Sequence, residues 1–361
     1  MKKLFIAIVA LAAAAACSNE EIVSVNREAI AFDNAFVNNA TRVKVDHTIN
    51  GDNIKNDYRG FGVYGFVTGT ATAPIFTNEA VTWGTVNNVS GWYHNTVQYW
   101  INGANYNFAA IAPYSDTTVN SGLYTVTEAT PSKTVLTYTN ECLDTELLYA
   151  TATATGSADG NAAVAFNFRH ILSKVKFTFK NKYNATNTEI GVKYIYIKDA
   201  YNTATATFTR DSTVWSGHDK ATNLSTEYQF GNAGTTNSNS DPLTRIPYNG
   251  SAESYYAKFL IPAGDANDDG VLDTLTYKVD FDIDLFVNGV LVKTFKHSYD
   301  NHETLTFSPK PGYYYNIVVE ITPDNIDKAG VQKPIEFTVN EIAEWDTDVN
   351  GNGQADDDVN M

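Results

Sequence analysis

The stretch Phe166–Asn181 alternates apolar and polar side chains on both sides of a short interruption at His170–Ser173. Its apolar positions are Phe166, Phe168, Val175, Phe177 and Phe179. A period of two with aromatic and β-branched residues is typical of a half-buried strand. The stretch therefore predicts two strands joined at a corner near the middle of the chain. We expect the first strand to close one β-domain and the second to open another.

The length and composition agree with an all-β protein of two domains. The chain has 361 residues, which is long for one β-sandwich and comfortable for two at roughly 100–200 residues per domain. It contains 22 Tyr and 19 Phe, and apolar residues make up 43%, enough to build real cores. Frequent Thr, Asn and aromatic residues favour strands joined by turns.

A β-hairpin is predicted most clearly over Tyr277–His297, where alternating strands flank Asn288-Gly289. Further strands are expected at Ala29–Phe32, Phe61–Val67, Leu147–Ala150, Val192–Lys198, Ala204–Thr209, Tyr255–Pro262, Tyr313–Thr322 and Ile335–Ile342. Val97–Pro113 reads as a strand, an Asn-Gly turn and a second strand. Ser212–Thr244 is rich in Ser, Thr, Asn and Gly, and predicts a long surface excursion.

The charge balance argues against two kinds of partner. There are 25 Lys and Arg against 41 Asp and Glu, a net charge of −16. Binders of nucleic acid or of anionic lipid surfaces are basic, so neither partner is expected. The two cysteines are Cys17 and Cys142, and because Cys17 has another explanation, no intrachain disulfide is predicted.

The N-terminus has the features of an export signal. Two lysines precede the apolar run Leu4–Leu11, and small residues precede Cys17, as in a bacterial lipobox. Cleavage there would leave Cys17 as a lipidated N-terminus, held to a membrane by acyl chains worth about 0.8 kcal/mol per buried CH₂. The alternative is an ordinary secretory signal with an incidental cysteine. No later segment reaches the ~18 apolar residues of a spanning helix.

Taken in order, these segments resemble the fimbrillin family, the type V pilins of Bacteroidia and their surface-lipoprotein relatives. The pieces that carry the resemblance are Cys17, Phe32 to Arg42, Phe61–Val67, Tyr99 to Pro113, Leu147–Ala150, Phe168–Val175 and a late strand ending at Trp345. The resemblance implies two tandem β-sandwich domains, Greek-key-like and transthyretin-like, after a lipoprotein signal peptide. The implied divisions are a signal peptide (1–16), a propeptide with a removable first strand (17–42), two sandwiches (43–169 and 170–345) and an acidic tail (346–361).

The resemblance also implies assembly by strand exchange with other fimbrial subunits. A maturation protease specific for arginine cuts, the first strand leaves, and a C-terminal strand of the next subunit fills the groove. Arg42 lies in a polar stretch after the first predicted strand and is the expected cut site, with Arg27 and Arg59 as rivals. An exposed groove would offer unpaired backbone groups for β-augmentation.

The donor strand is less sharply defined. Ile335, Phe337 and Val339 alternate with polar residues and form a candidate donor strand, or else the last strand of their own domain. Little strand-like sequence follows Trp345, which argues against polymerisation of the shaft type and leaves open a tip or accessory subunit or a relative that does not polymerise. Residues 18–21 resemble the acidic tag that sends lipoproteins of Bacteroidia to the surface of the outer membrane, with incorporation into a fimbrium after processing.

A calcium loop is a further candidate site. Asp265, Asn267, Asp269 and Asp273 occupy positions 1, 3, 5 and 9 of an EF-hand-type loop with glycine at position 6. Position 12 is Thr276 instead of Glu, and residues 348–356 repeat the pattern more weakly. The alternative is an acidic turn, where these residue types are common. No other cofactor is expected.

No sequence motif indicates an enzyme. There is no HExxH, no GxSxG elbow and no phosphate-binding glycine loop. His170 is expected to be a corner histidine satisfied by backbone groups. Trp83, Trp92 and Trp100 would either line a sugar platform or, the better explanation, pack in the core. We therefore predict a structural or adhesive fimbrial subunit, with a cell-surface glycan-binding lipoprotein as the alternative.

Overall fold

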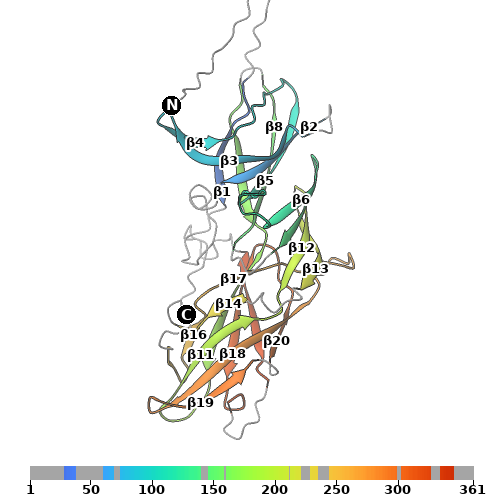
Figure 1. Cartoon of the computed structure of the whole chain (residues 1–361). Coiled ribbons are helices and arrows are strands. Elements are labelled where there is room, and N and C mark those ends of the chain that lie inside the picture. Colours follow the sequence, from blue (N-terminus) through green and yellow to red (C-terminus); the bar gives the residue numbers. More distant parts are fainter. Residues whose placement is uncertain are drawn as a thin grey trace, which may run out of the picture.

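The computed structural model describes residues 28–37, 60–68, 74–139, 145–157, 160–210, 212–220, 228–234, 244–298, 302–326 and 334–344. Every regular element in these ranges is a β-strand, which confirms the all-β prediction. The molecule is elongated, with strands from the first half of the chain at one end and β11, β18 and β19 at the other (Figure 1). Over the same ranges, no helix is long and apolar enough to cross a membrane.

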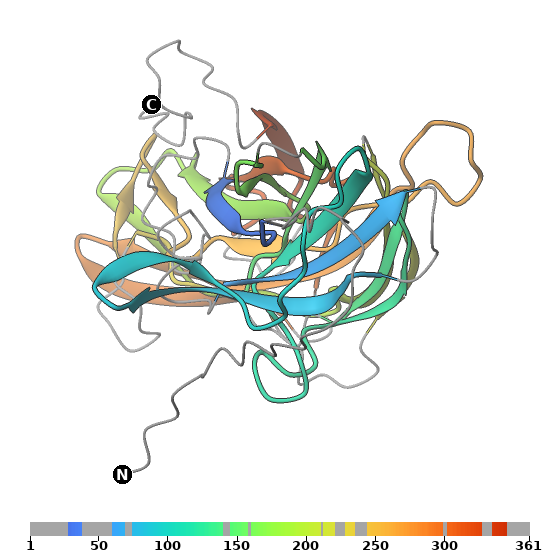
Figure 2. The same cartoon turned by 90° about the horizontal axis from the view of Figure 1, so that it is seen from above.

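A seven-stranded sheet forms the N-terminal end of the molecule, in the order β1-β9-β8-β5-β2-β3-β4. Its strands are β1 (Phe32–Val37), β2 (Phe61–Thr68), β3 (Phe76–Val86), β4 (Val89–Tyr93), β5 (Asn105–Ala112), β8 (Leu148–Thr155) and β9 (Val164–His170). One face of this sheet surrounds a cluster rich in aromatic side chains, including Phe61, Phe108 and Phe166. In the view of Figure 2, the short blue β1 lies within the outline formed by the other strands.

A four-stranded sheet in the order β13-β12-β7-β6 provides a second layer. Its strands are β6 (Tyr124–Ala129), β7 (Thr134–Thr139), β12 (Tyr201–Phe208) and β13 (Thr213–Lys220). Its apolar residues share a second buried cluster with Tyr64, Phe66 and Ile111 of the seven-stranded sheet. The hairpin β12–β13 thus follows the corner near residue 170 in sequence, yet pairs with β7 from before that corner.

Two further sheets face each other at the C-terminal end. One contains β10 (Ser173–Asn181), β16 (Ser251–Glu253), β17 (Lys258–Leu260), β21 (Tyr313–Ile321) and β22 (Phe337–Glu344). The other contains β11 (Thr188–Ile197), β14 (Tyr228–Gly231), β15 (Ile246–Pro247), β18 (Leu275–Val287), β19 (Val290–His297) and β20 (Glu303–Phe307). A single large cluster of buried side chains from both sheets fills the space between them.

The two strongest strand predictions are confirmed. β9 and β10 lie on either side of Ile171 and Leu172, as the corner at Phe166–Asn181 required. β18 and β19 form the predicted hairpin, with Asn288 and Gly289 both at positive φ (51° and 77°). Positive φ at both central residues is the geometry of a type I′ turn, for which Asn-Gly is favoured.

Two segment predictions are wrong. The first half of Val97–Pro113 is no strand: only Tyr99 forms a bridge, to Ala29, and it is the second half that forms β5. Ser212–Thr244 is more than a surface excursion, because it contains β13 and β14. Trp215 anchors β13 to the core, since its side chain is buried and its Nε1 donates a hydrogen bond to the Ile171 carbonyl at 3.1 Å.

Candidate functional site

The first described segment, residues 28–37, is bound through its backbone along two sides. On one side, Ile30 N donates to Gln98 O at 2.7 Å, and Trp100 N donates to Glu28 O at 3.0 Å. On the other side, Val164 N donates to Ala31 O at 2.8 Å, and β1 continues parallel to β9. The strand therefore fills a slot between β9 and the stretch that follows β4.

Two apolar side chains of this segment enter the core of the seven-stranded sheet. Ile30 and Phe32 are 1% and 3% exposed. The Phe32 ring contacts Phe76, Phe108 and Phe166 with centroid distances of 5.4, 6.0 and 5.9 Å, and it contacts His94 at 5.0 Å. Removing the segment would therefore open an aromatic groove and leave two rows of backbone groups without partners.

Glu79 shapes the loop that borders this slot. Its carboxylate accepts hydrogen bonds from Asn95 N at 2.7 Å, from Thr96 N at 2.8 Å and from Thr96 Oγ1 at 2.5 Å. Partial burial raises the pKa of Glu79, but the bonds from Thr96 and Asn95 outweigh it and hold the pKa below its usual value. The anchored loop leads directly into residues 98–100, which pair with the first segment.

The last described strand, β22, lies at the edge of its sheet, antiparallel to β21. Ile335 is buried in the C-terminal core, and Phe337 and Val339 pack against that core while partly exposed. The Phe337 ring lies 6.4 Å from that of Phe177. The three apolar residues that define the candidate donor strand thus cover the core of their own subunit in this structure.

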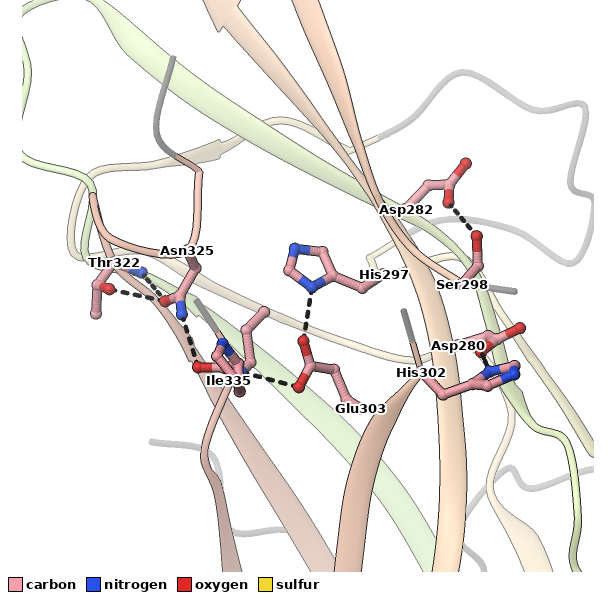
Figure 3. A network of polar contacts seen from close by, with 10 residues as sticks. Asp280, Asp282, His297, Ser298, His302, Glu303, Thr322, Asn325 and Ile335 are labelled. Atoms are coloured by element: carbon pink, nitrogen blue, oxygen red, sulfur yellow. Dashed lines mark hydrogen bonds and ion pairs between the residues drawn. The ribbon is translucent and has the colours of Figure 1, made fainter. Parts of the chain in front are cut away.

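A buried carboxylate fixes the start of this last strand. Glu303 Oε2 accepts a hydrogen bond from Ile335 N at 2.9 Å, and Glu303 Oε1 lies 2.7 Å from His297 Nδ1 (Figure 3). The His297 ring stacks on Phe281 with a centroid distance of 5.3 Å. Asn325 Nδ2 adds a bond to the Pro334 carbonyl at 3.3 Å. These contacts hold residues 334 and 335, just before β22 begins.

The other predicted site residues divide into two groups. Cys17 and Arg42 lie outside the described residues, as does the second candidate calcium loop. In the first loop, Asp265 accepts hydrogen bonds from the backbone N–H groups of Asp269 and Gly270, and Asp273 accepts one from Ala266. No group of three or more His, Cys, Asp or Glu that could hold a metal ion occurs in the described part of the chain.

His170 and the tryptophans are explained by packing. The partner that the structure shows for His170 Nδ1 is the carboxylate of Glu146, a side chain and not a backbone group, and both side chains are fully buried. Trp92 and Trp100 belong to the aromatic core of the seven-stranded sheet, and Trp83 packs against it. Sequence reasoning missed Glu79, Glu146 and Glu303, three of the carboxylates that fix loops and strand ends.

These residues define an all-β structural protein of paired sheets, whose first and last described strands each close a core. The sequence matches the family model described as fimbrillin-like over residues 41–345, most of the chain. The protein therefore belongs to the fimbrillin-like family, as the resemblance in its sequence predicted. The family is one of structural and adhesion proteins of cell-surface fimbriae.

The chain is also similar to solved structures. A fimbrial protein from Bacteroides vulgatus is 18% identical, with 88% of this chain and 100% of that chain covered and a TM-score of 0.59. The fimbrial anchor protein Mfa2 from Porphyromonas gingivalis is 11% identical, with 79% and 90% covered and a TM-score of 0.30. No curated protein matches the sequence. The similarity to the Bacteroides vulgatus protein shows that the two chains share a fold.

Proposed function

We propose that this protein is a structural and adhesive subunit of a surface fimbria that assembles by strand exchange. Cleavage after Arg42 by a protease with arginine specificity would separate residues 28–37 from the rest of the subunit. An extended segment of another subunit would then replace β1 beside β9. Anchoring through a lipid on Cys17 to the outer membrane, before processing, belongs to the same proposal.

The observation that carries the proposal is the way the first segment is held. Its links to the remaining chain include main-chain hydrogen bonds on two sides and two buried side chains, Ile30 and Phe32. An incoming strand with apolar residues at alternate positions would restore both kinds of contact, which is β-augmentation. Parallel pairing with β9 fixes the direction that such a strand would take if it followed β1.

The division of the chain into 43–169 and 170–345 belongs to this proposal as well, although the hairpin β12–β13 of the second unit pairs with β7 of the first. The first unit holds the slot for β1, and the second carries the candidate donor residues Ile335, Phe337 and Val339 at its edge strand. To act as a donor, β22 must leave β21 and break the contact between Ile335 N and Glu303. A subunit that keeps β22 in place would serve at a tip or as an accessory subunit.

The test is limited proteolysis of the purified, unlipidated protein with an arginine-specific protease, followed by mass spectrometry and size-exclusion chromatography. We expect a cut after Arg42 and a ladder of oligomers in the wild type. Arg42→Ala should stay uncut and monomeric, whereas the matched control Arg59→Ala should behave as the wild type. A cut at Arg42 without oligomers would restrict the subunit to a tip or anchor position, and resistance of Arg42 would contradict the mechanism.

Calcium binding by the loop Asp265–Asp273 stays a separate proposal. Carboxylate oxygens at alternate positions are the ligands that calcium prefers. In this structure those of Asp265 and Asp273 accept backbone N–H groups, so binding would require them to turn. Titration calorimetry with calcium and thermal unfolding with calcium or with a chelator test this proposal. The absence of both a heat of binding and a shift in Tm would contradict calcium binding.

A further inference from the structure

Three aspartates lie in a row on the outer face of β18. Asp280, Asp282 and Asp284 alternate with Phe281 and Ile283, which enter the core. Although they face away from the core, the three aspartates are only 3%, 8% and 3% exposed. Long side chains of β11 and β19 flank them, since Asp282 lies opposite Lys193 on one neighbouring strand and Lys296 on the other.

Two of the three carboxylates have close partners, and the middle one does not. Asp284 accepts bonds from Lys193 Nζ at 2.6 Å and Thr294 Oγ1 at 2.5 Å. Asp280 pairs with His302 Nδ1. Among the described residues, Asp282 accepts one hydrogen bond, from Ser298 Oγ at 3.4 Å, and its other oxygen points away from that serine (Figure 3).

Burial of a carboxylate with so few donors is unfavourable. Desolvation accordingly raises the pKa of Asp282, although Lys296 and Lys193 oppose the effect. The free acceptor positions of Asp282 face a cavity of about 470 Å³, which lies within the ~300–1,000 Å³ range of small-molecule sites. Lys296 lines the same cavity and forms no ion pair within the described part of the chain.

Two tyrosines of β11 line another side of this cavity. A bulge in β11 between Lys193 and Tyr196 places Tyr194 at φ +55°, where a bulky side chain is rare. Buried Asn232 holds the bulge, because its Oδ1 accepts the N–H of Tyr194 at 3.2 Å. The bulge leaves the Tyr194 side chain 40% exposed at the cavity, next to Tyr196.

The donors and acceptors of the cavity define the chemistry of a ligand. Carboxylates only accept hydrogen bonds, and ammonium groups only donate them, whereas a hydroxyl group does both. The cavity has two of each charged group, Asp280 and Asp282 with Lys198 and Lys296, so its charges balance and favour a neutral ligand. Tyrosine rings add flat apolar surface with a polar tip.

We propose that this cavity binds a neutral, polyhydroxylated ligand, namely a saccharide unit of a glycan. Hydroxyl groups of the sugar donate to Asp282 and accept from Lys296, while a C–H face of its ring lies on Tyr194. The cavity involves neither β1 nor β22. The site therefore stands or fails independently of strand exchange, and it goes beyond the proposed assembly by giving the subunit an adhesive ligand.

The experiment uses the uncut, unlipidated full chain and a panel of neutral mono- and disaccharides, with binding measured by saturation-transfer NMR and calorimetry. Sialylated and amine-bearing sugars serve as anionic and cationic probes. We expect neutral sugars to bind and both Asp282→Ala and Tyr194→Ala to weaken binding at least tenfold. Asp219→Ala and Tyr248→Ala remove the same groups elsewhere, and Tyr248 is 44% exposed; both controls should bind as the wild type.

Three outcomes would overturn the proposal. The first is the failure of every neutral sugar to bind the folded wild-type protein. The second is binding that Tyr194→Ala, a substitution at an exposed position, leaves unchanged. The third is binding of only the charged probes, which would contradict the charge balance of the cavity. Thermal unfolding of each variant verifies folding, so loss of binding through misfolding is recognised.

Discussion

Replacing Phe32 by alanine measures how strongly the first strand closes the N-terminal core. The side chain is 3% exposed and lies among three phenylalanine rings and the ring of His94, at centroid distances of 5.0 to 6.0 Å. Truncation of a buried phenylalanine costs about 3–5 kcal/mol, because transfer free energy is lost and a cavity remains. Domains have a stability of about 5–15 kcal/mol, so we expect a large part of it to disappear.

Urea unfolding followed by tryptophan fluorescence is the appropriate assay. Trp92 and Trp100 belong to the same buried cluster as Phe32, so their emission reports on this half of the molecule. Val292→Ala on β19 is the control, since Val292 is 53% exposed and its truncation should change stability by less than about 0.5 kcal/mol. A loss below about 1 kcal/mol for Phe32→Ala would refute the placement of β1 in this core.

Three other predictions concern carboxylates. Glu303→Gln should destabilise the protein by about 1–3 kcal/mol in thermal unfolding and speed amide exchange at Ile335, because a buried charged acceptor is lost; unchanged exchange would argue against the contact. The pKa of Glu79 is lowered from 4.5 in the folded state, so its stabilisation is present above that pH and declines as the pH falls through the folded value. Glu79→Gln should therefore flatten the acid limb of a stability–pH curve, and an unaltered limb would contradict this. Asp265→Ala should lower the free energy of unfolding by about 0.5–1.5 kcal/mol, because two N–H groups lose their acceptor. An unchanged free energy of unfolding would show that water replaces the carboxylate.

Strands that obey a strict local pattern could be predicted from the sequence. The alternation at Phe177 and Phe179 and the Asn288-Gly289 turn depend on neighbouring residues, so the strands β10, β18 and β19 follow from periodicity and turn chemistry alone. The family resemblance rested on the order of such segments. It is confirmed by the fimbrillin-like family model, which matches residues 41–345.

Contacts between distant segments could not be predicted in this way. Residues 28–30 pair with 98–100, and no local signal marks either stretch as the partner of the other. The strand β13 was not predicted, because the residues around Trp215 are mostly polar. The buried Trp215 side chain anchors this strand through its bond to the Ile171 carbonyl. The sequence does contain a signal for Glu303, because this residue occupies an inward position of β20, in phase with the buried Leu305 and Phe307. A charge in the apolar phase of a strand indicates a buried partner.

The two ends of the described chain differ in what must be broken to free them. The first segment makes three backbone bonds outside its ladder with β9 and buries two side chains, Ile30 and Phe32. At about 0.5–1.5 kcal/mol per bond and about 1.5–3 kcal/mol per side chain, these contacts supply roughly 5–10 kcal/mol. A factor of ten corresponds to 1.4 kcal/mol, so a cut segment would leave its slot unaided only rarely. In the proposed strand exchange, an incoming strand would therefore replace β1 residue by residue, so that each new contact compensates for one that is lost. To detach, the edge strand β22 must lose its ladder with β21, the Glu303 contact at its start and the Lys310–Glu341 ion pair. The burial of Ile335 and the packing of Phe337 and Val339 on the C-terminal core would be lost as well. In the proposed exchange, an incoming strand must restore the contacts that β1 loses, and a donor β22 must first break contacts with its own core.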